Sequence, residues 1–393
     1  MRRLICLFAL LSALAVHAQS YYLLVGTYTN MGSSSSAPPR DSTGSKGIYV
    51  YRWETATGQA TLLSHTTDVV NPSFLDISPD GQHVYAATET RTAGAGSISA
   101  FSLDRESGTL RFINKVPSGG DNPVYVAVHR SGRWVALANY TGGSLSVFPI
   151  KGDGALLPYV QNVQHTGHSI NPTRQDKPHV HSVVFSPDNR TLYAQDLGED
   201  SISVYGFDSG VDLPLRGGIP AGQPQRESAK ISITPGSGPR HLTFHPNGKY
   251  AYLIEEMGGS IDIFRYYPGT GHLQLLQRIA AHADTAKGPF RSSDIHVSAD
   301  GRFLYATNRE AESNIAVFAV DPSKGTLRTI GYQSVLGKEP RNFILDPTGN
   351  FLLVANQDSN TVVVFKVDKK TGLLEPTGQR LEVPSPSCLK MVK

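Results

Sequence analysis

The residues in this sequence that are best suited to chemistry are histidines, arginines and acidic side chains at the start of similar short apolar segments. Four such starts contain histidine or arginine, namely Pro178-His179-Val180-His181, Pro239-Arg240-His241, Arg291-Ser292-Ser293-Asp294 and Glu339-Pro340-Arg341-Asn342. Guanidinium and imidazole groups bind carboxylate and phosphate oxygens through charge-assisted hydrogen bonds. The whole chain has a formal charge of only +3, so composition does not explain this concentration. We therefore predict a site for a small anionic ligand.

A second group of polar residues ends the apolar segment that follows each start. It comprises Asn139-Tyr140, Gln195-Asp196, Glu255-Glu256, Asn308-Arg309 and Asn356-Gln357. Glu256 has the clearest chemical use, because a carboxylate beside several arginines is ionised and can orient or deprotonate a water molecule. The sequence has no motif for a covalent nucleophile and no phosphate-binding glycine loop. We therefore expect water to be the nucleophile in any hydrolysis.

These segments belong to a repeat of roughly fifty residues, which is typical of a propeller blade. Each copy has an apolar run, a tight turn, a second apolar run, an alternating run that ends in an aromatic residue, and a fourth run. The first turns are Ser78-Pro79-Asp80-Gly81, His129-Arg130-Ser131-Gly132, Ser186-Pro187-Asp188-Asn189, His245-Pro246-Asn247-Gly248, Ser298-Ala299-Asp300-Gly301 and Asp346-Pro347-Thr348-Gly349. A seventh copy is divided between the chain ends, with three strands from residues 21–64 and the innermost strand from residues 387–392.

We therefore predict an all-β fold, a seven-bladed β-propeller closed by pairing of the C-terminal strand with the N-terminal blade. Such closure leaves no exposed sheet edge at the seam. The innermost strands of a propeller line its central channel, and their first residues lie at one mouth of it. The chemically useful residues are thus expected to converge at that mouth. The alternative for Arg240, Arg291 or Arg341 taken singly is that each braces neighbouring blades.

A metal site is the alternative use of the histidines. His179 and His181 alternate, so they face the same side of a strand, and His165 and His168 are near them in the sequence. However, His165 and His168 belong to a connecting segment, and no carboxylate has a spacing diagnostic of metal binding. We therefore predict neither a metal nor another cofactor. We also predict no nucleic-acid partner, because the net charge is small and there is no lysine- and arginine-rich run.

The first eighteen residues have the pattern of a signal peptide. Two arginines precede an apolar stretch, Leu4 to Val16, and small residues stand before a cleavage point near Ala18. This stretch is short for a membrane span. We expect residues 1–18 to be removed and residues 19–393 to form a single propeller domain without a membrane span, exported to the periplasm or secreted. Only Cys388 would then remain, so no intramolecular disulfide can form, and its apolar neighbours predict that it is buried.

Several longer motifs resemble those of the seven-bladed propeller lactonases, the family that contains bacterial 6-phosphogluconolactonase and fungal carboxy-muconate cyclase. These motifs are Gly26-Thr27-Tyr28-Thr29, His179-Val180-His181-Ser182, residues 238–248, residues 294–309 and Pro340-Arg341-Asn342-Phe343. The resemblance covers nearly all of the chain after the expected signal peptide. It implies hydrolysis of a sugar lactone, so that the partner is a small anionic lactone or sugar acid.

The resemblance also implies roles for individual residues. The expected catalytic residues are Glu256, His181 or His179, Arg240 and Arg291, with Glu256 or a histidine activating water and the arginines stabilising the oxyanion. The expected substrate-binding residues, which follow from their places at the strand starts and ends rather than from the resemblance, are His241, Asp294, Arg309, Arg341, Asn342 and Asn139. Relatives commonly have Asn-Glu where this chain has Glu255-Glu256, which predicts an additional negative charge at the mouth.

Two other functions fit the same residues. One is a muconate-type cycloisomerase, in which the arginines hold carboxylates while a general acid or base closes the lactone. The other is a non-enzymatic exported propeller that serves as a binding scaffold. The sequence identifies no protein partner.

Overall fold

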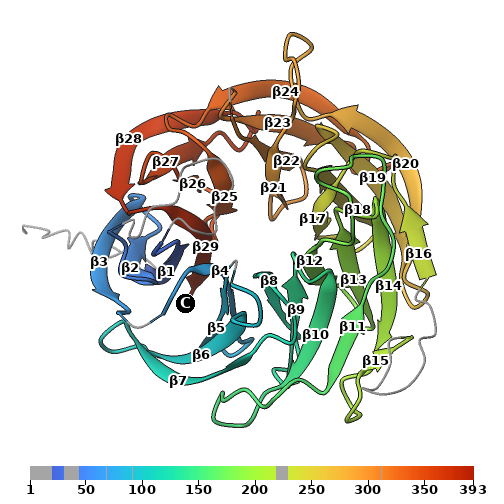
Figure 1. Ribbon diagram of the computed structural model, residues 1–393. Helices are drawn as coiled ribbons and strands as arrows, with labels where there is room; N and C mark the ends of the chain where they lie inside the picture. The colour runs from blue at the N-terminus through green and yellow to red at the C-terminus, as the bar shows by residue number, and fades with distance from the viewer. Residues whose placement is uncertain (1–19, 31–43, 68, 91, 218–228, 311) are drawn as a thin grey trace, which may run out of the picture.

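The computed structural model describes residues 20–30, 44–67, 69–90, 92–217, 229–310 and 312–393. Within these residues every regular element is a strand, and the strands form seven antiparallel sheets around one axis (Figure 1). The predicted all-β, seven-bladed propeller is therefore confirmed. The described residues contain no helix that is long and apolar enough to cross a membrane. The expected signal peptide lies outside the described residues.

We number the sheets as blades 1 to 7, and list the strands of each blade from the axis outward. Blade 1 has β4 (Pro72–Ile77), β5 (His83–Thr88), β6 (Ser97–Asp104) and β7 (Thr109–Pro117), and blade 2 has β8 (Pro123–Val128), β9 (Trp134–Asn139), β10 (Ser144–Pro149) and β11 (Gln161–Gln164). Blade 3 has β12 (Val180–Phe185), β13 (Thr191–Asp196) and β14 (Ser201–Phe207), with β15 (Leu215–Arg216) and β16 (Ala229–Ser232) both paired to β14. Blade 4 has β17 (Pro239–Phe244), β18 (Tyr250–Glu255), β19 (Ser260–Tyr267) and β20 (His272–Ala280), and blade 5 has β21 (Ser292–Val297), β22 (Phe303–Asn308), β23 (Asn314–Val320) and β24 (Leu327–Ser334). Blade 6 has β25 (Pro340–Leu345), β26 (Phe351–Asn356), β27 (Thr361–Val367) and β28 (Leu374–Glu382), and blade 7 has β29 (Pro386–Val392), β1 (Ser20–Thr27), β2 (Tyr49–Glu54) and β3 (Gln59–His65).

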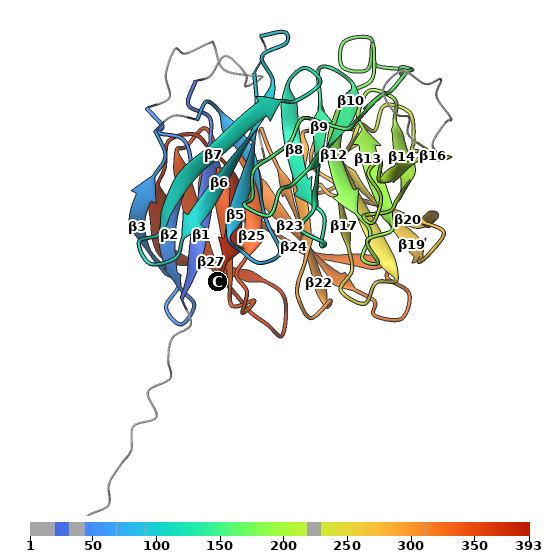
Figure 2. The same ribbon diagram turned by 90° about the horizontal axis from the view of Figure 1, so that it is seen from below.

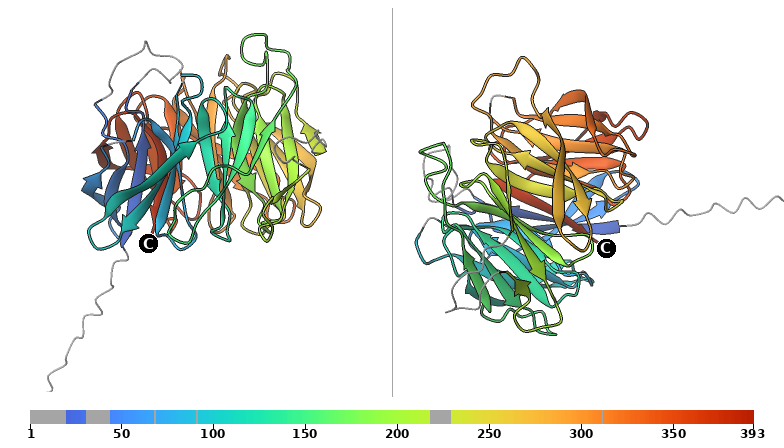
Figure 3. Two further views of the ribbon diagram at one scale, coloured as in Figure 1. Left: turned by 60° about the horizontal axis from the view of Figure 1, so that its bottom comes forward. Right: turned by 90° about the vertical axis from the view of Figure 1, so that its right-hand side faces the viewer.

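Blade 7 closes the ring with strands from both ends of the chain. The innermost strand β29 pairs antiparallel with β1, so that Tyr22 is opposite Val392 and Gly26 is opposite Cys388. The C-terminus and the start of β1 therefore lie at the same face of the propeller (Figures 2 and 3). Because β29 ends at this face, it begins at the opposite one, which is at the top in Figure 2. We call the end of the channel where the innermost strands begin the upper mouth.

Neighbouring blades are held together by buried apolar side chains. Between blades 4 and 5, for example, Tyr252 and Ile254 pack in one cluster with Leu304 and Phe318. Burying a side chain of this size contributes about 1.5–3 kcal/mol relative to leaving it exposed. The predicted burial of Cys388 is also confirmed, since its side chain has no exposed surface.

A buried tyrosine in the second strand of four blades adds a hydrogen bond to the next blade. The hydroxyls of these residues donate to glycine carbonyl oxygens at 2.7–3.1 Å, in the pairs Tyr85–Gly154, Tyr193–Gly271, Tyr252–Gly325 and Tyr305–Gly372. The bond satisfies a hydroxyl that would otherwise be buried without a partner. The blades are therefore fixed relative to one another, and so are the side chains that each blade brings to the axis.

Candidate active site

Every innermost strand departs from regular pairing close to its first residue. In six blades one residue has no partner in the second strand, namely Ser73, Val124, His181, Arg240, Arg341 and Ser387, and in blade 5 both Ser293 and Asp294 are skipped. A β-bulge of this kind changes the direction of a side chain. The six single residues line one small cavity on the axis, together with Phe74 and His241. We call these six residues and Ser293 the inner ring.

Serine hydroxyls hold the inner ring of neighbouring blades at one level. The Oγ atoms of Ser182, Ser293 and Ser387 donate to the carbonyl oxygens of Arg240, Arg341 and Ser73, respectively, at 2.6–2.9 Å. Each bond joins the start of one innermost strand to the start of the next. The arginines of the inner ring therefore have fixed backbones, and only their side chains can adjust to a ligand.

A second ring is formed by the residue that directly follows the second strand of each blade. Its members are Tyr28, Glu89, Tyr140, Leu197, Glu256, Arg309 and Gln357. In every blade the N–H of this residue donates a hydrogen bond of 2.7–3.1 Å to a carbonyl oxygen at the start of the innermost strand. The acceptor belongs to the residue directly before the first one that pairs with the second strand. The seven positions are thus structurally equivalent, and the side chains of Tyr28, Glu89, Tyr140 and Glu256 contact residues of the inner ring.

Glu256 is the centre of the largest cluster of charges at this mouth. Its Oε1 accepts a hydrogen bond from Nη2 of Arg174 at 2.6 Å. Its Oε2 accepts from Nε of Arg240 at 3.1 Å and lies 3.2 Å from Nη2 of Arg309. Nε2 of His181 lies 3.6 Å from the same oxygen. The structure therefore brings Glu256, Arg240, Arg309 and His181 together, as the sequence predicts, and adds Arg174.

The arginines keep Glu256 ionised. Burial alone would raise its pKa, but Arg309, Arg174 and Arg240 overcome this effect and hold the pKa of Glu256 well below its usual value. Glu256 is thus a carboxylate whose charge is balanced by the guanidinium groups around it. Both of its oxygens are also engaged with guanidinium groups. Glu256 is consequently suited to holding cations in place rather than to removing a proton from water.

His181 is a neutral imidazole in this cluster. Burial, reinforced by Arg240, lowers the pKa of His181 well below its usual value. Its Nδ1 is buried and has no hydrogen-bond partner among the described residues. A tautomer with its hydrogen on Nε2 directs that N–H toward Glu256 and leaves the lone pair on Nδ1. His181 can therefore accept a proton in the inner ring, and Glu256 would stabilise the imidazolium that forms.

A histidine and an aspartate fix the guanidinium group of Arg240. Its Nη1 donates to the carbonyl oxygen of Ser293 at 2.7 Å and to Nε2 of His241 at 3.0 Å. Nδ1 of His241 donates to Oδ1 of Asp294 at 2.7 Å, and burial lowers the pKa of His241 to about 4. His241 is thus neutral and its Nε2 is an acceptor. Burial, followed by the repulsion from Arg309, lowers the pKa of Arg240 to about 9, which leaves it charged at neutral pH.

Arg341 belongs to a second cluster that the sequence did not predict. The hydroxyl of Tyr28 donates to Oε2 of Glu89 at 2.6 Å, and Nη2 of Arg341 lies 3.7 Å from the same oxygen. The guanidinium carbon of Arg341 lies 5.1 Å from the centre of the Tyr28 ring. Tyr28 and Glu89 are both buried. Glu89 contacts Nη2 of Arg341 and the ring of Tyr28 lies against its guanidinium group. Both occupy the repeat position of Glu256, and comparison of equivalent positions along the chain could have found them.

The remaining predicted arginine, Arg291, is held by carboxylates of its own. Its Nη1 pairs with Glu310 and lies 3.7 Å from Oε1 of Glu339. Glu339 also lies 3.4 Å from Nη1 of Arg309. Arg291 is therefore joined to the Glu256 cluster through Glu339 and Arg309, and not by direct contact. Its side chain is 15% exposed.

Three further predicted residues have defined places. The ring of His179 stacks on Tyr140 with 4.6 Å between ring centres, and its Nδ1 lies 3.0 Å from the carbonyl oxygen of Tyr140. Asn342 donates to Asp294 and accepts from the N–H of Leu389, so it helps to place the carboxylate that orients His241. Asn139 is different, because its side chain is wholly buried within blade 2 and its Nδ2 bonds serine hydroxyls there. The structure does not bring it to the upper mouth.

The prediction that Glu255 adds a negative charge at the mouth is wrong. Its side chain is fully buried within blade 4, where its Oε2 accepts from Nη2 of Arg278 at 2.5 Å. Burial and the neighbouring Asp262 raise the pKa of Glu255 to about 8. Successive residues at the end of a strand point in opposite directions, so Glu255 faces the interior while Glu256 faces the mouth.

The four histidines considered for a metal do not converge. Nδ1 of His165 lies 2.7 Å from Oδ2 of Asp196 and its Nε2 lies 2.9 Å from the hydroxyl of Tyr205. His168 is exposed. In the part of the chain that the structure describes, His165, Asp196 and Glu199 are the one group with a spacing suited to a metal. Both nitrogens of His165 are already hydrogen-bonded, so the group is explained without an ion.

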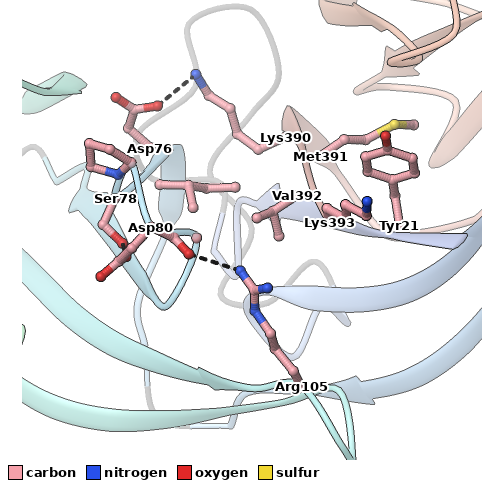
Figure 4. A pocket seen from close by; sticks show the side chains of 12 residues that line it. Tyr21, Asp76, Ser78, Asp80, Arg105, Lys390, Met391, Val392 and Lys393 are labelled. Carbon is pink, nitrogen blue, oxygen red and sulfur yellow. Dashed lines mark hydrogen bonds and ion pairs between the residues drawn. The ribbon is translucent and has the colours of Figure 1, made fainter. Parts of the chain in front are cut away.

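A different hollow lies at the opposite end of the innermost strands (Figure 4). It is lined by the turn after β4 and by the last residues of β29. Nζ of Lys390 lies 3.2 Å from Oδ1 of Asp76, and Nη2 of Arg105 donates to the carbonyl oxygen of Asp80 at 3.0 Å. Both of these cations are thus engaged within the protein, and none of the predicted site residues lines this hollow.

Comparison with known proteins agrees with the fold. The family model described as lactonase, 7-bladed beta-propeller, matches residues 22–391. The chain is 39% identical to the 6-phosphogluconolactonase of Formosa agariphila over 88% of this chain and 95% of that protein. It is 33% identical to the 6-phosphogluconolactonase of Bacillus subtilis over 95% and 98% of the two chains. The solved structure of the periplasmic gluconolactonase of Pseudomonas aeruginosa superposes with a TM-score of 0.83 and 37% identity, over 95% of this chain and 99% of that one.

Proposed function

The chain belongs to the seven-bladed β-propeller lactonase family, and from this premise we propose that it hydrolyses a sugar lactone of the 6-phosphogluconolactone type. The observation that carries the proposal is the cluster of Glu256, Arg240, Arg309 and His181 at the upper mouth. It offers a neutral imidazole beside fixed guanidinium groups. Addition of water to an ester carbonyl needs these two kinds of group, a proton acceptor and a cation for the oxyanion.

In the proposed reaction water attacks the lactone carbonyl carbon while Nδ1 of His181 accepts a proton from it. The carbonyl oxygen becomes negatively charged and is stabilised by Arg240, whose position is fixed by His241 and Ser293. The tetrahedral intermediate then collapses, the bond between the carbonyl carbon and the ring oxygen breaks, and the ring oxygen takes the proton from His181. The products are a free hydroxyl and a carboxylic acid, and no covalent enzyme intermediate is needed.

Glu256 has a supporting role in this mechanism. Its negative charge keeps Arg240 and Arg309 in place and stabilises the imidazolium form of His181. This assignment differs from one in which Glu256 is the base, and it is favoured because guanidinium groups engage both oxygens of Glu256 whereas Nδ1 of His181 has no partner among the described residues. A general base contributes about 10²- to 10⁴-fold to a rate, and one donor to an oxyanion about 10²- to 10³-fold.

The proposal is tested by the rate of lactone hydrolysis. The purified protein is given 6-phosphogluconolactone or glucono-δ-lactone, acid release is followed, and the spontaneous rate is subtracted. We expect turnover that is largely abolished by His181→Gln and by Arg240→Ala. Arg380→Ala is the control, because Arg380 is exposed on the outer strand β28 and pairs with Glu382 there. Absence of turnover with both lactones would contradict the proposal and favour the cycloisomerase or the binding scaffold.

We also propose that the protein is exported, to the periplasm or beyond, after removal of residues 1–18. The proposal is supported by the signal-peptide pattern and by the similarity to the periplasmic gluconolactonase. Cell fractionation and mass spectrometry of the purified protein test it. A full-length chain recovered from the cytoplasmic fraction would contradict it.

A further inference from the structure

Among the described residues three arginines pair with Glu256, and of these Arg174 alone lies outside the propeller repeat. It belongs to the segment between β11 and β12, whereas Arg240 and Arg309 occupy repeated positions in blades 4 and 5. Its Nη2 donates to Glu256 and, at 3.2 Å, to the hydroxyl of Tyr140. Its side chain is 37% exposed, compared with 2% for Arg240 and 2% for Arg309. Arg174 is therefore the outermost cation of the cluster and the one that a ligand at the mouth can reach.

The segment that carries Arg174 is held in a defined conformation. Oδ1 of Asn171 accepts hydrogen bonds from the N–H groups of Thr173 and Arg174, both at 3.0 Å. The side chain of Gln175 is fully buried and donates to the carbonyl oxygen of Leu197 at 2.9 Å. Neither contact involves the guanidinium group. The backbone beneath Arg174 is thus fixed in advance, and its side chain can exchange partners without moving the segment.

Glu256 keeps two other guanidinium partners if Arg174 turns toward a ligand. It retains the two buried guanidinium groups of Arg240 and Arg309 on Oε2, while Arg174 occupies Oε1 alone. An incoming dianion at the mouth can therefore attract Arg174 and leave the deeper cluster assembled. A planar guanidinium group with free N–H donors suits a phosphate, which accepts two parallel hydrogen bonds.

We propose that Arg174 determines substrate specificity by binding the phosphate of a phosphorylated sugar lactone. The inference rests on the proposed function, since it names the residue that distinguishes a phosphorylated from an unphosphorylated substrate at the same site. Arg240 and Arg309 act deeper in the channel, and Arg174 contacts the substituent that remains at the mouth. Such a residue changes binding of the phosphorylated compound and leaves the hydrolytic groups in place.

Binding of the stable product-type acids tests the inference separately from turnover. Gluconate and 6-phosphogluconate share a carboxylate and differ in the phosphate, and their dissociation constants are measured by isothermal titration calorimetry at constant ionic strength. We expect the wild-type protein to bind 6-phosphogluconate more tightly. Arg174→Ala should reduce this preference about 10- to 100-fold, the range for one or two hydrogen bonds between charged groups. The affinity for gluconate should change by no more than about threefold, an allowance for the small perturbation expected at an exposed site.

Two variants complete the experiment. Arg174→Lys keeps a point charge without the bidentate geometry, so it should restore part of the preference, and Arg380→Ala should leave it unchanged. An equal loss for both acids, an undiminished preference in Arg174→Ala, or no preference in the wild-type protein would each overturn the inference. If the preference depends on Arg174 but neither lactone is hydrolysed, the inference stands and the proposed hydrolysis fails.

Discussion

Replacement of Glu256 by glutamine should destabilise the protein much more than the same replacement of its neighbour Glu255. The Glu256 carboxylate lies 3.1 Å from Nε of Arg240 and 3.2 Å from Nη2 of Arg309, and all three side chains are at most 4% exposed. At such distances each pair of charges attracts by about 5 kcal/mol at an effective dielectric constant of about 20. Desolvation offsets part of this, and removing one partner of a buried pair costs about 3–5 kcal/mol. Because Glu256 serves two buried guanidinium groups, we expect a loss near the upper value.

Glu255→Gln is the matched control. The pKa of Glu255 is raised to about 8 by burial and by Asp262, so at pH 7 its carboxyl group holds a proton and is replaced by another neutral group. The amide oxygen of the glutamine can still accept the hydrogen bond that Arg278 donates to Glu255. We therefore expect the free energy of unfolding to change by less than about 1 kcal/mol, because the hydrogen bond from Arg278 is kept and one neutral group replaces another.

The measurement is urea-induced unfolding of both variants and the wild-type protein at several pH values. The pKa of folded-state Glu256 is lowered, so its stabilising effect is complete above the unfolded-state pKa of about 4.3 and is lost as the pH falls through the folded-state pKa. The difference between wild type and Glu256→Gln should accordingly be constant near neutrality and shrink below about pH 4. A loss below about 1 kcal/mol at pH 7, or equal losses in the two variants, would refute the electrostatic reasoning.

Three other predictions follow from the same geometry. Arg240→Ala should lower kcat/KM for glucono-δ-lactone by about 10²- to 10³-fold while the chain stays folded, and unchanged kinetics would remove Arg240 from the mechanism. Burial and Arg240 lower the pKa of His181, so His181 should stay unprotonated, and kcat/KM constant, as the pH falls past its usual pKa of about 6.5. The rate should decline only well below that pH. A decline centred at or above about 6.5 would contradict the assignment of His181 as the base. Burial raises the pKa of the Cys388 thiol to about 12 and leaves the side chain no exposed surface. A thiol reagent at a mildly alkaline pH should therefore label Cys388 only after urea unfolds the chain. Rapid labelling of Cys388 in the native protein would be inconsistent with the fold.

The fold could be predicted from the sequence because each blade repeats the same run of strands and turns. The repeat gives the number of blades, and the incomplete copies at the two ends indicate closure by β29. Strand starts then identify Arg240, Arg341 and His181 as neighbours on the axis. The repeat does not say which of two adjacent residues faces the mouth, and for that reason Glu255 was misplaced while Glu256 was not.

Arg174 could not be found in the same way. Its segment has no counterpart in the other blades, and its approach to Glu256 depends on how Asn171 and Gln175 fold the chain between β11 and β12. The sequence separation between Arg174 and Glu256 also carries no periodic signal. By contrast, Glu89 could have been found, since it occupies the repeat position of Glu256 in blade 1.

The carboxylates of Glu256, Glu339 and Glu89 at the upper mouth do not argue against an anionic ligand, because each of these three is engaged with a cation of the protein. Glu256 pairs with the buried Arg240 and Arg309, and Glu339 pairs with Arg309 and Arg291. The paired guanidinium groups differ in depth, as their exposed fractions show. The side chains of Arg240 and Arg309 are 2% exposed, those of Arg291 and Arg341 are 15% and 16% exposed, and that of Arg174 is 37% exposed. Under the proposed function, a lactone that enters carbonyl first meets the buried arginines at its reacting carbon and leaves its phosphate at the level of Arg174. Depth in the channel would therefore separate catalysis from substrate selection, which is why the two can be tested with different variants.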